Sequence, residues 1–209
     1  MTGELKSHGA AILCGGQSRR MGFDKALALR NRDGRPLLAF LAGELAGRFG
    51  EVILVTNDLD KLSGRAELKA YRRAADLHPG AGPAGAIHTA LAACPGRALF
   101  VMACDLPVID WPVIDRMRAL MDERGADVVV PRHGELREPL YAFYGPGSEP
   151  VFRAGLAGGL RKIWAFYPGL KTVYLDLNER DLASGFLDNL NTPADLRRAG
   201  LPLPGREYE

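Results

Sequence analysis

Four short, mostly apolar runs constrain the fold of this chain more than any other feature of its sequence. They occupy residues 10–13, 52–55, 98–103 and 127–131. Apolar runs of this length are typical of strands that helices cover on both faces, as in parallel sheets. The segments between them carry helical spacing or helix-start signals, so strands and helices alternate over the first 130 residues. This alternation predicts an α/β fold with a Rossmann-like, doubly wound, mostly parallel sheet and helices on both faces.

The second half of the chain predicts additions to this sheet. Residues 138–144 are aromatic and β-prone, and Pro139 suits the start of a strand better than its middle. A short turn separates them from residues 127–131, so we expect one antiparallel strand. The other expected elements are short helices at 150–156 and 159–166, a late strand at 171–175, and a helical turn with a short strand near 68–71.

The composition bounds the class of protein. At 209 residues the chain has the size of one large α/β domain, so we expect a single domain over residues 1–209. A net charge of +2 with scattered arginines gives no electrostatic footprint for nucleic acid. Three cysteines without CxxC spacing favour a reducing, cytoplasmic location over a disulfide framework. No apolar run approaches the length of a membrane span, so we do not expect a membrane protein.

A glycine-rich loop with three cations follows the first predicted strand. It runs from Leu13, Cys14, Gly15 and Gly16 to Arg19, Arg20 and Lys25. Adjacent glycines remove the Cβ atoms that keep a ligand from the backbone, and exposed N–H groups beside cations attract a phosphate. The spacing matches neither the dinucleotide pattern GxGxxG nor a P-loop. The alternative is a plain strand-to-helix turn with a solvated basic face.

Polar residues or glycines follow the other predicted strands as well. They are Asn57, Asp76 with the glycine-rich loop at Gly82-Pro83, and Asp105. In a doubly wound sheet such positions meet at one edge, where ligands bind. A carboxylate at the end of a buried strand is costly without a cation, so Asp105 is predicted to hold a metal. The alternative is that Asp105 caps the next helix, a role that Asp110 fills better because it directly precedes Trp111-Pro112.

Together these features predict transfer chemistry at a nucleoside triphosphate. A phosphate loop with Lys25, opposed by a metal carboxylate, supplies the positive charge that phosphoryl oxygens and a pyrophosphate leaving group need. An attacking phosphate is already anionic and needs no general base. His78 and His88 lack the HxxxH and HExxH patterns, so we interpret them as ordinary loop and helix residues. Asn189 and Asn191 alternate along an extended segment, where both amides could bind polar ligand groups.

At these motifs the chain resembles the MobA-like family of nucleotidyltransferases, the molybdenum cofactor guanylyltransferases. Residues 13–25 look like the family's LAGGxSxRMGxDK, residues 82–85 like its GPLAG, and residues 104–107 like its CDxP. Residues 189–193 are similar to its NxNTP element, which narrows the resemblance toward the molybdopterin branch. Cys14 and Ala84 stand where the family usually has alanine and leucine.

The resemblance implies transfer of GMP from Mg²⁺-GTP to the terminal phosphate of molybdopterin, with pyrophosphate released. The implied nucleotide-binding residues are Leu13, Cys14, Gly15, Gly16, Lys25, Asn57, Asp76, Gly82, Pro83 and Asp105. The implied catalytic residues are Arg19, Lys25 and Asp105, with Asp105 as the Mg²⁺ ligand, and the implied acceptor-binding residues are Arg161, Asn189 and Asn191. The N-terminal half would bind the nucleotide and the C-terminal half the acceptor. Transient contacts with proteins of cofactor biosynthesis or delivery are also implied.

Three alternatives stay open. A cytidylyltransferase of the same family favours alanine at the second glycine and lacks the GPxAG loop, so Gly16 and Gly82-Pro83 favour guanine. A sugar-1-phosphate nucleotidyltransferase is disfavoured because the chain ends soon after residues 189–193. A non-catalytic nucleotide-binding adaptor would tolerate loss of a metal carboxylate, so the presence of both Lys25 and Asp105 argues against it.

Overall fold

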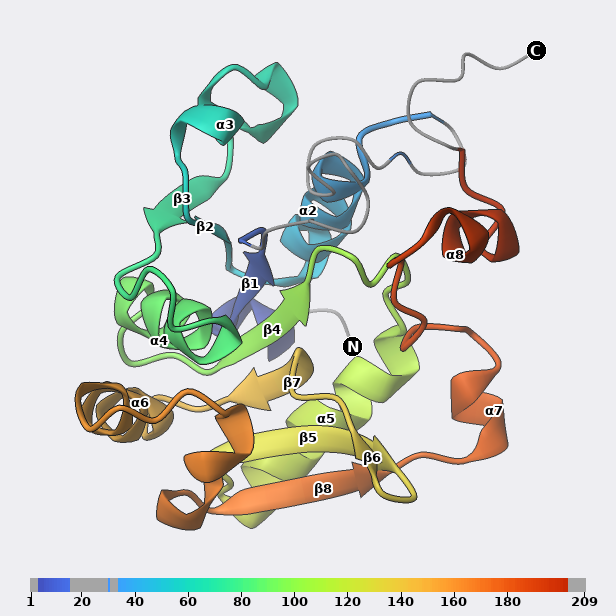
Figure 1. Ribbon diagram of the computed structural model, residues 1–209. Coiled ribbons are helices and arrows are strands. Elements are labelled where there is room, and N and C mark those ends of the chain that lie inside the picture. The colour runs from blue at the N-terminus through green and yellow to red at the C-terminus, as the bar shows by residue number, and fades with distance from the viewer. Residues whose placement is uncertain (1–3, 16–29, 31–33, 203–209) are drawn as a thin grey trace.

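The computed structural model describes residues 4–15, 30 and 34–202 (Figure 1). The strands are β1 (Gly9–Leu13), β2 (Glu51–Thr56), β3 (Arg72–Ala75), β4 (Leu99–Ala103), β5 (Val128–His133), β6 (Leu136–Arg137), β7 (Tyr141–Tyr144) and β8 (Thr172–Asp176). The α-helices are α2 (Leu37–Arg48), α3 (Asp60–Ser63), α4 (Pro83–Ala93), α5 (Trp111–Arg124), α6 (Ser148–Ala157), α7 (Glu179–Leu182) and α8 (Pro193–Arg198). Short 3₁₀ turns are η1 (Glu4–Ser7), η2 (Ala66–Leu68), η3 (Ile163–Ala165) and η4 (Tyr167–Gly169). None of the helices described is long and apolar enough to cross a membrane.

All of these strands belong to one sheet with the order β3-β2-β1-β4-β7-β5-β6, and β8 also pairs with β5. The strands β1 to β4 are parallel to one another, and β5 is parallel to β8. Between these two groups lies β7, which runs antiparallel to both β4 and β5. The predicted mostly parallel sheet with an antiparallel addition is therefore confirmed.

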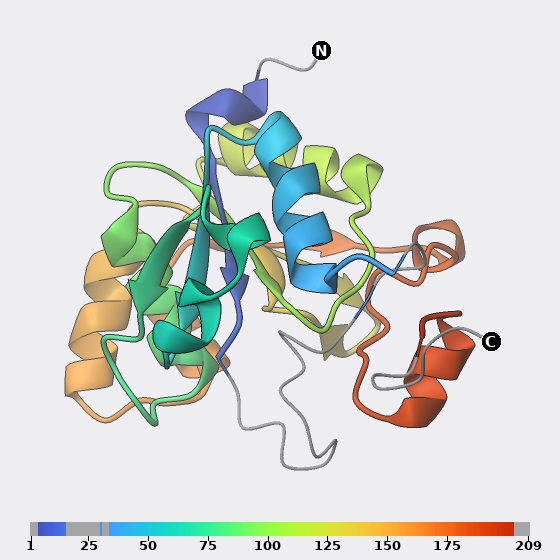
Figure 2. The ribbon, with the colours of Figure 1, turned by 90° about the horizontal axis from the view of Figure 1, so that it is seen from above.

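Side chains from the two faces of the sheet enter two separate cores. On β1, for example, Ala10 and Ile12 belong to one core and Ala11 and Leu13 to the other. The first core is closed by α2 and α5, and the second by α4 and α6 (Figure 2). Strands buried on both faces need apolar residues at every position, which is why they read as continuous runs in the sequence. The prediction of helices on both faces is confirmed.

Two local predictions are wrong. The strand expected near residues 68–71 forms four residues later, as β3, while Leu68 packs into the core from the turn η2. As an edge strand, β3 has exposed and half-buried residues, so it lacks the apolar run that marks the central strands. The helix expected at 159–166 is replaced by η3 and η4, because the backbone is not helical at Gly159 (φ +89°) or at Lys162, which is extended.

Candidate active site

The carboxyl ends of β1 to β4 form one continuous edge. Beyond the strands, the amide of Cys104 donates to the carbonyl of Leu13 (3.2 Å), that of Cys14 to Val55 (2.7 Å) and that of Asp76 to Thr56 (2.8 Å). The chain leaves β1 toward β2 on one side and returns as β4 on the other side. Ligands of open α/β sheets bind at such a switch point. The prediction that these loops meet at one edge of the sheet is therefore confirmed. They carry residues 13–15, Asn57, Asp76 and Asp105.

At the end of β1, Gly15 lies against the side chain of Asn57. A Cβ atom at position 15 would lie 3.1 Å from Asn57 Oδ1 and 3.3 Å from its Cγ. Glycine therefore lets the exposed Asn57 amide approach the backbone of the loop that follows β1. This contact brings Asn57 to the position that a nucleotide-binding role requires, although that role remains a prediction.

The loop between β3 and α4 is organised around Asp76. Its Oδ1 atom accepts from the amide of His78 (2.9 Å). It also accepts from the hydroxyl of Thr89, which lies within α4 (3.2 Å). The loop ends at Gly82, whose φ of 68° and ψ of −155° favour glycine, and Pro83 opens α4. The N-terminus of α4 thus begins at the same edge of the sheet as Asp76.

Asp105 lies in the loop between β4 and α5, and the C-terminal segment packs directly on this loop. The carbonyl of Asp105 accepts from the amide of Leu190 (2.9 Å), which lies between Asn189 and Asn191. The loop is also tied to β7, since the amide of Asp110 donates to the hydroxyl of Tyr141 (2.8 Å). Asp110 Oδ1 accepts from Val113 N (3.0 Å) and caps α5, as predicted. Helix capping therefore does not explain Asp105.

Glu138 is a carboxylate at this site that the sequence did not reveal. It lies before β7, where Leu140 N donates to its Oε1 (3.0 Å) and Leu140 O accepts from Ala103 N (3.0 Å). Burial raises the pKa of the Glu138 carboxyl above its usual value, and the nearby charge of Asp105 raises it further. The only sequence signal was the proline at 139, which keeps Glu138 outside the strand.

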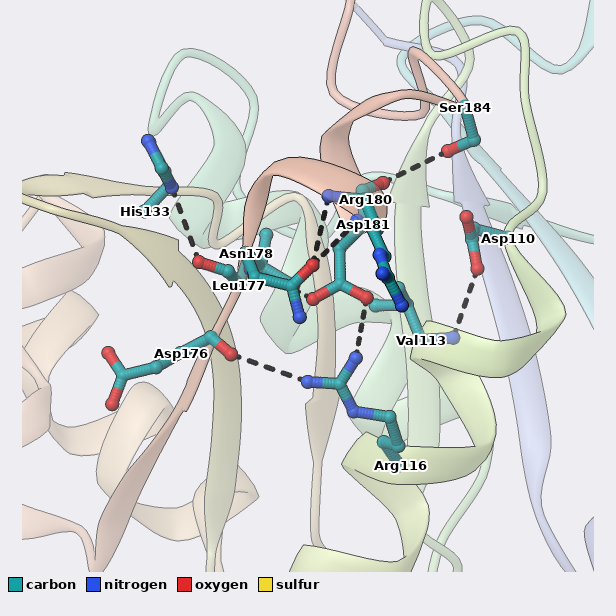
Figure 3. Close-up of polar contacts among 10 residues, drawn as sticks. All are labelled: Asp110, Val113, Arg116, His133, Asp176, Leu177, Asn178, Arg180, Asp181 and Ser184. Carbon is teal, nitrogen blue, oxygen red and sulfur yellow. Dashed lines mark hydrogen bonds and ion pairs between the residues drawn. The ribbon is translucent and has the colours of Figure 1, made fainter.

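Polar contacts to α5 hold the chain from Asp176 to Asp181, which leads to Asn189 and Asn191 (Figure 3). Arg116 Nη1 donates to Asp181 Oδ1 (2.6 Å), and Arg116 Nη2 donates to the carbonyl of Asp176 (3.3 Å). Asp181 also accepts from the amide of Asn178 (2.9 Å), in a capping box that opens α7. Further along, Phe186 is fully buried against the ring of Tyr141, with centroids 4.7 Å apart. These contacts fix the route of the chain to Leu190.

Comparison with known proteins places the chain in a family. The model of the MobA-like NTP transferase domain matches residues 10–172. The chain belongs to the MobA-like NTP transferase family. A relative from Pelotomaculum thermopropionicum, a probable molybdenum cofactor guanylyltransferase, is 37% identical over 192 residues, covering 90% of this chain and 89% of the relative. A second probable molybdenum cofactor guanylyltransferase, from Methanothermobacter thermautotrophicus, is 31% identical over 90% of this chain and 96% of its own length.

The solved structures agree with this family. The crystal structure of molybdopterin-guanine dinucleotide biosynthesis protein A from Archaeoglobus fulgidus superimposes with a TM-score of 0.77 at 27% identity. It covers 91% of this chain and 96% of that protein. The resemblance inferred from the sequence motifs is therefore confirmed, as is the class of enzyme, a nucleotidyltransferase.

Enzymes of the MobA-like family are typically metal-dependent, and the residues around Asp105 fit a hard cation. The carboxylates of Asp105 and Glu138 supply oxygen atoms, the kind of ligand that Mg²⁺ prefers. Among the described residues no three His, Cys, Asp or Glu side chains form a metal-binding group. Mg²⁺ keeps several waters and binds through one or two carboxylates plus substrate phosphates, so a fuller set of protein ligands is not required.

Four predicted site residues are not placed in the site by the structure. Gly16, Arg19 and Lys25 of the family's first motif lie outside the described residues. Arg161 is exposed in the connection after α6, where its Nη1 donates to the carbonyls of Leu156 (3.1 Å) and Leu160 (2.7 Å). These contacts are local, so acceptor binding by Arg161 stays a prediction.

Proposed function

We propose that this chain is a molybdenum cofactor guanylyltransferase, which transfers GMP from GTP to the terminal phosphate of molybdopterin and releases pyrophosphate. Its similarity to molybdenum cofactor guanylyltransferases supports this activity. The single observation that carries the proposal is the hydrogen bond from Leu190 N to Asp105 O (2.9 Å). Because of it, the Asn189–Asn191 segment lies against the loop that carries Asp105, at the switch point of the sheet, so two substrates could meet there.

The nucleotide half of the proposed site consists of the ends of β1 to β3. Backbone groups of Leu13, Cys14 and Gly15 would hold the base and phosphates together with Gly16, and Asn57 and Asp76 would contact the nucleoside. The N-terminus of α4 directs backbone N–H groups and a positive dipole toward the same edge, which favours an anionic ligand. Arg19 and Lys25 would neutralise the phosphates.

The acceptor half is proposed to consist of Asn189, Asn191 and Arg161, whose polar groups suit a pterin and its phosphate. An oxygen of the acceptor phosphate attacks the α-phosphorus of GTP and forms a new P–O bond, while the bond from that phosphorus to the bridging oxygen of pyrophosphate breaks. Bound Mg²⁺ would supply charge stabilisation for the leaving pyrophosphate. Asp105 would hold this ion, with Glu138 beside it, and no protein group has to remove a proton.

Guanine is the proposed base because glycine-rich backbone would line the base-binding part of the site. Gly16 and the Gly82-Pro83 loop would present main-chain donors and acceptors to one base edge without intervening side chains. We further propose that residues 1–209 act as one domain, in the cytoplasm, with transient contacts to proteins that make or receive the cofactor.

Pyrophosphate release by the purified protein tests this proposal. The reaction contains molybdopterin, Mg²⁺ and either GTP or CTP, with omission of each component as the control. We expect release with GTP that depends on molybdopterin and Mg²⁺. Release with CTP in place of GTP would overturn the guanine assignment, and release without molybdopterin would overturn the acceptor.

A further inference from the structure

A chain of three side chains outside the proposed reaction joins α6 to the loop between β3 and α4. His88 Nε2 lies 3.1 Å from Glu149 Oε1, and His88 Nδ1 lies 2.9 Å from His78 Nε2. The two imidazole rings are 4.9 Å apart between centroids. The sequence predicted these histidines to be ordinary loop and helix residues, and it gave no sign of the hydrogen bond that joins them.

For a neutral His88, the chemistry of these groups leaves one arrangement of protons. A carboxylate only accepts hydrogen bonds, so His88 Nε2 carries the proton that Glu149 receives. In a neutral imidazole the other nitrogen is then an acceptor, so His88 Nδ1 receives the proton of His78 Nε2. Every polar atom between Glu149 and His78 is therefore satisfied.

Because His88 is buried, breaking the hydrogen bonds between His78, His88 and Glu149 costs free energy. His88 is 4% exposed, in the middle of α4, and a buried polar ring without partners costs roughly 1–3 kcal/mol. The start of α6, which carries Glu149, is fixed beside the sheet. Ser148 is fully buried there, and its Oγ donates to the carbonyl of Asp127, just before β5 (3.0 Å). The helices α4 and α6 lie side by side in Figure 1. Glu149 thus provides a fixed point from which His88 is oriented.

The other end of the chain holds the loop of the proposed nucleotide site. His78 donates its amide to Asp76 Oδ1 (2.9 Å), and its carbonyl accepts from Ala81 N (2.9 Å). It also sits tightly on α4, where a Cβ atom at Gly85 would lie 3.0 Å from His78 Cβ and 3.2 Å from its carbonyl oxygen. The backbone and Cβ of His78 therefore contact Asp76, Ala81 and the first turn of α4.

We propose that His88 and Glu149 are positioning residues for the nucleotide: they orient His78 and so keep the loop from Asp76 to Gly82 against the N-terminus of α4. Neither residue needs to touch the substrates. This inference rests on the proposed nucleotide role of Asp76 and Gly82-Pro83. It extends the functional network to α6, a helix that carries none of the residues proposed to bind substrate.

The first test compares variants by steady-state kinetics with GTP. In His88→Phe a ring of similar size fills the core but both hydrogen bonds are lost, and Glu149→Ala removes the anchor. We expect KM for GTP to rise about tenfold in both, with kcat at saturating GTP within about twofold of the unmodified protein. Glu149→Gln keeps an oxygen acceptor for His88 and should restore a KM within about twofold.

Leu91→Ala is the matched control for lost stability. Leu91 lies on the same helix, is 2% exposed and faces the same core, but lies outside the His78–His88–Glu149 chain. We expect Leu91→Ala to lower the melting temperature while KM for GTP stays unchanged. An unchanged KM in His88→Phe, or an equal rise in Leu91→Ala at matched loss of stability, would overturn the positioning role.

A second readout does not depend on catalysis. Amide hydrogen exchange in the peptide covering residues 76–83 should become faster in His88→Phe and Glu149→Ala than in Leu91→Ala. If the unmodified protein uses no GTP, the proposed function fails while this measurement still decides whether the chain holds the loop. Unchanged exchange in both variants would overturn the inference whatever the activity.

Discussion

Asp105 is the residue on which the proposed chemistry depends most, and its surroundings explain its position. It follows β4, whose residues Leu99 to Met102 are fully buried. Asp105 is half-buried, and Glu138 lies nearby. The backbone carbonyl of Asp105 accepts from Leu190, between Asn189 and Asn191. Two acidic groups close together raise the energy of the ion-free site, and a bound divalent cation relieves it.

The variant Asp105→Asn tests this role. We expect kcat for pyrophosphate release to fall about 100-fold or more, since one charge that stabilises the transition state is lost. Circular dichroism should show an unchanged fold. Asp110→Asn, in the same loop, is the matched control, because asparagine caps helices as well as aspartate does. Equal activity of both variants would remove Asp105 from the metal site.

Asp195 supplies a prediction about pH. Hydrogen bonds from Thr192 and the amide of Asn191 lower its pKa below the ordinary 3.8. A lowered carboxyl pKa adds stability above pH 3.8 that is lost as pH falls through the folded-state value. Asp195→Ala should therefore lower the melting temperature by about 2 °C at pH 7. The difference should shrink at pH 3.

Glu123→Ala, an exposed substitution on α5, provides the control for removal of a carboxylate. It should leave the melting temperature unchanged at both pH values. If the effect of Asp195→Ala were as large at pH 3 as at pH 7, the ionised capping box would not be its cause.

Residue-level predictions succeeded where the signal is local. The cap at Asp110, for example, follows from helix-start chemistry within a few positions of the chain. Glu138 and the His78–His88 pair were missed because their partners come from distant parts of the chain: Glu138 meets Asp105 only after β7 pairs with β4. Arg19 and Lys25 stay predictions from the family motif.

At the scale of elements, α5 links the two proposed halves of the site. Its start is capped by Asp110 in the loop after β4, and Arg116, two turns later, holds the segment from Asp176 to Asp181. That segment continues to Leu190 and its bond with Asp105 O. A single helix thus positions the metal carboxylate and the route of the acceptor segment.

The Arg116–Asp181 pair tests this link. Asp181 has 13% of its side chain exposed, so Asp181→Ala removes a well-shielded partner. We expect KM for molybdopterin to rise severalfold while KM for GTP stays the same. Arg116→Ala should act similarly, and the double variant should be little worse than either single one, with a coupling of about 1 kcal/mol.

The control pair lies on the same helix. Arg118 Nη1 and Asp122 Oδ2 are 2.6 Å apart within α5. Arg118→Ala removes an arginine of the same kind without loosening the C-terminal segment, so both KM values should stay unchanged. Strictly additive effects of Arg116→Ala and Asp181→Ala would show that the pair does not act as a unit.

Predictions of helices and strands also succeeded where the signal is local and failed where it depends on distant parts of the chain. The central strands were found because burial on both faces requires apolar runs. The edge strand β3 was misplaced because half-exposed residues such as Arg72 and Arg73 give no such run. The position of β7 between β4 and β5 was not foreseen, since sheet order depends on packing between distant strands and not on any single segment.

At the scale of the whole molecule, the sheet brings the proposed nucleotide-binding half and the proposed acceptor-binding half to one edge. The order β3-β2-β1-β4 creates the switch point, and β7, β5 and β8 extend the sheet toward the C-terminal segment. The chain then returns along the side of the sheet through α7 to α8 (Figure 1). Both halves have to be present in one chain for the proposed transfer, because Asp105 belongs to the first and its neighbour Leu190 to the second.

Transfer of label from GTP to molybdopterin measures this central claim most directly. GTP radiolabelled at its α-phosphorus is incubated with molybdopterin, Mg²⁺ and the protein, and the products are separated and counted. We expect the label to appear in a molybdopterin guanine dinucleotide with the unmodified protein and to stay in GTP with Asp105→Asn. Label that remains in GTP with the unmodified protein, or appears only as free GMP, would contradict the proposed transfer.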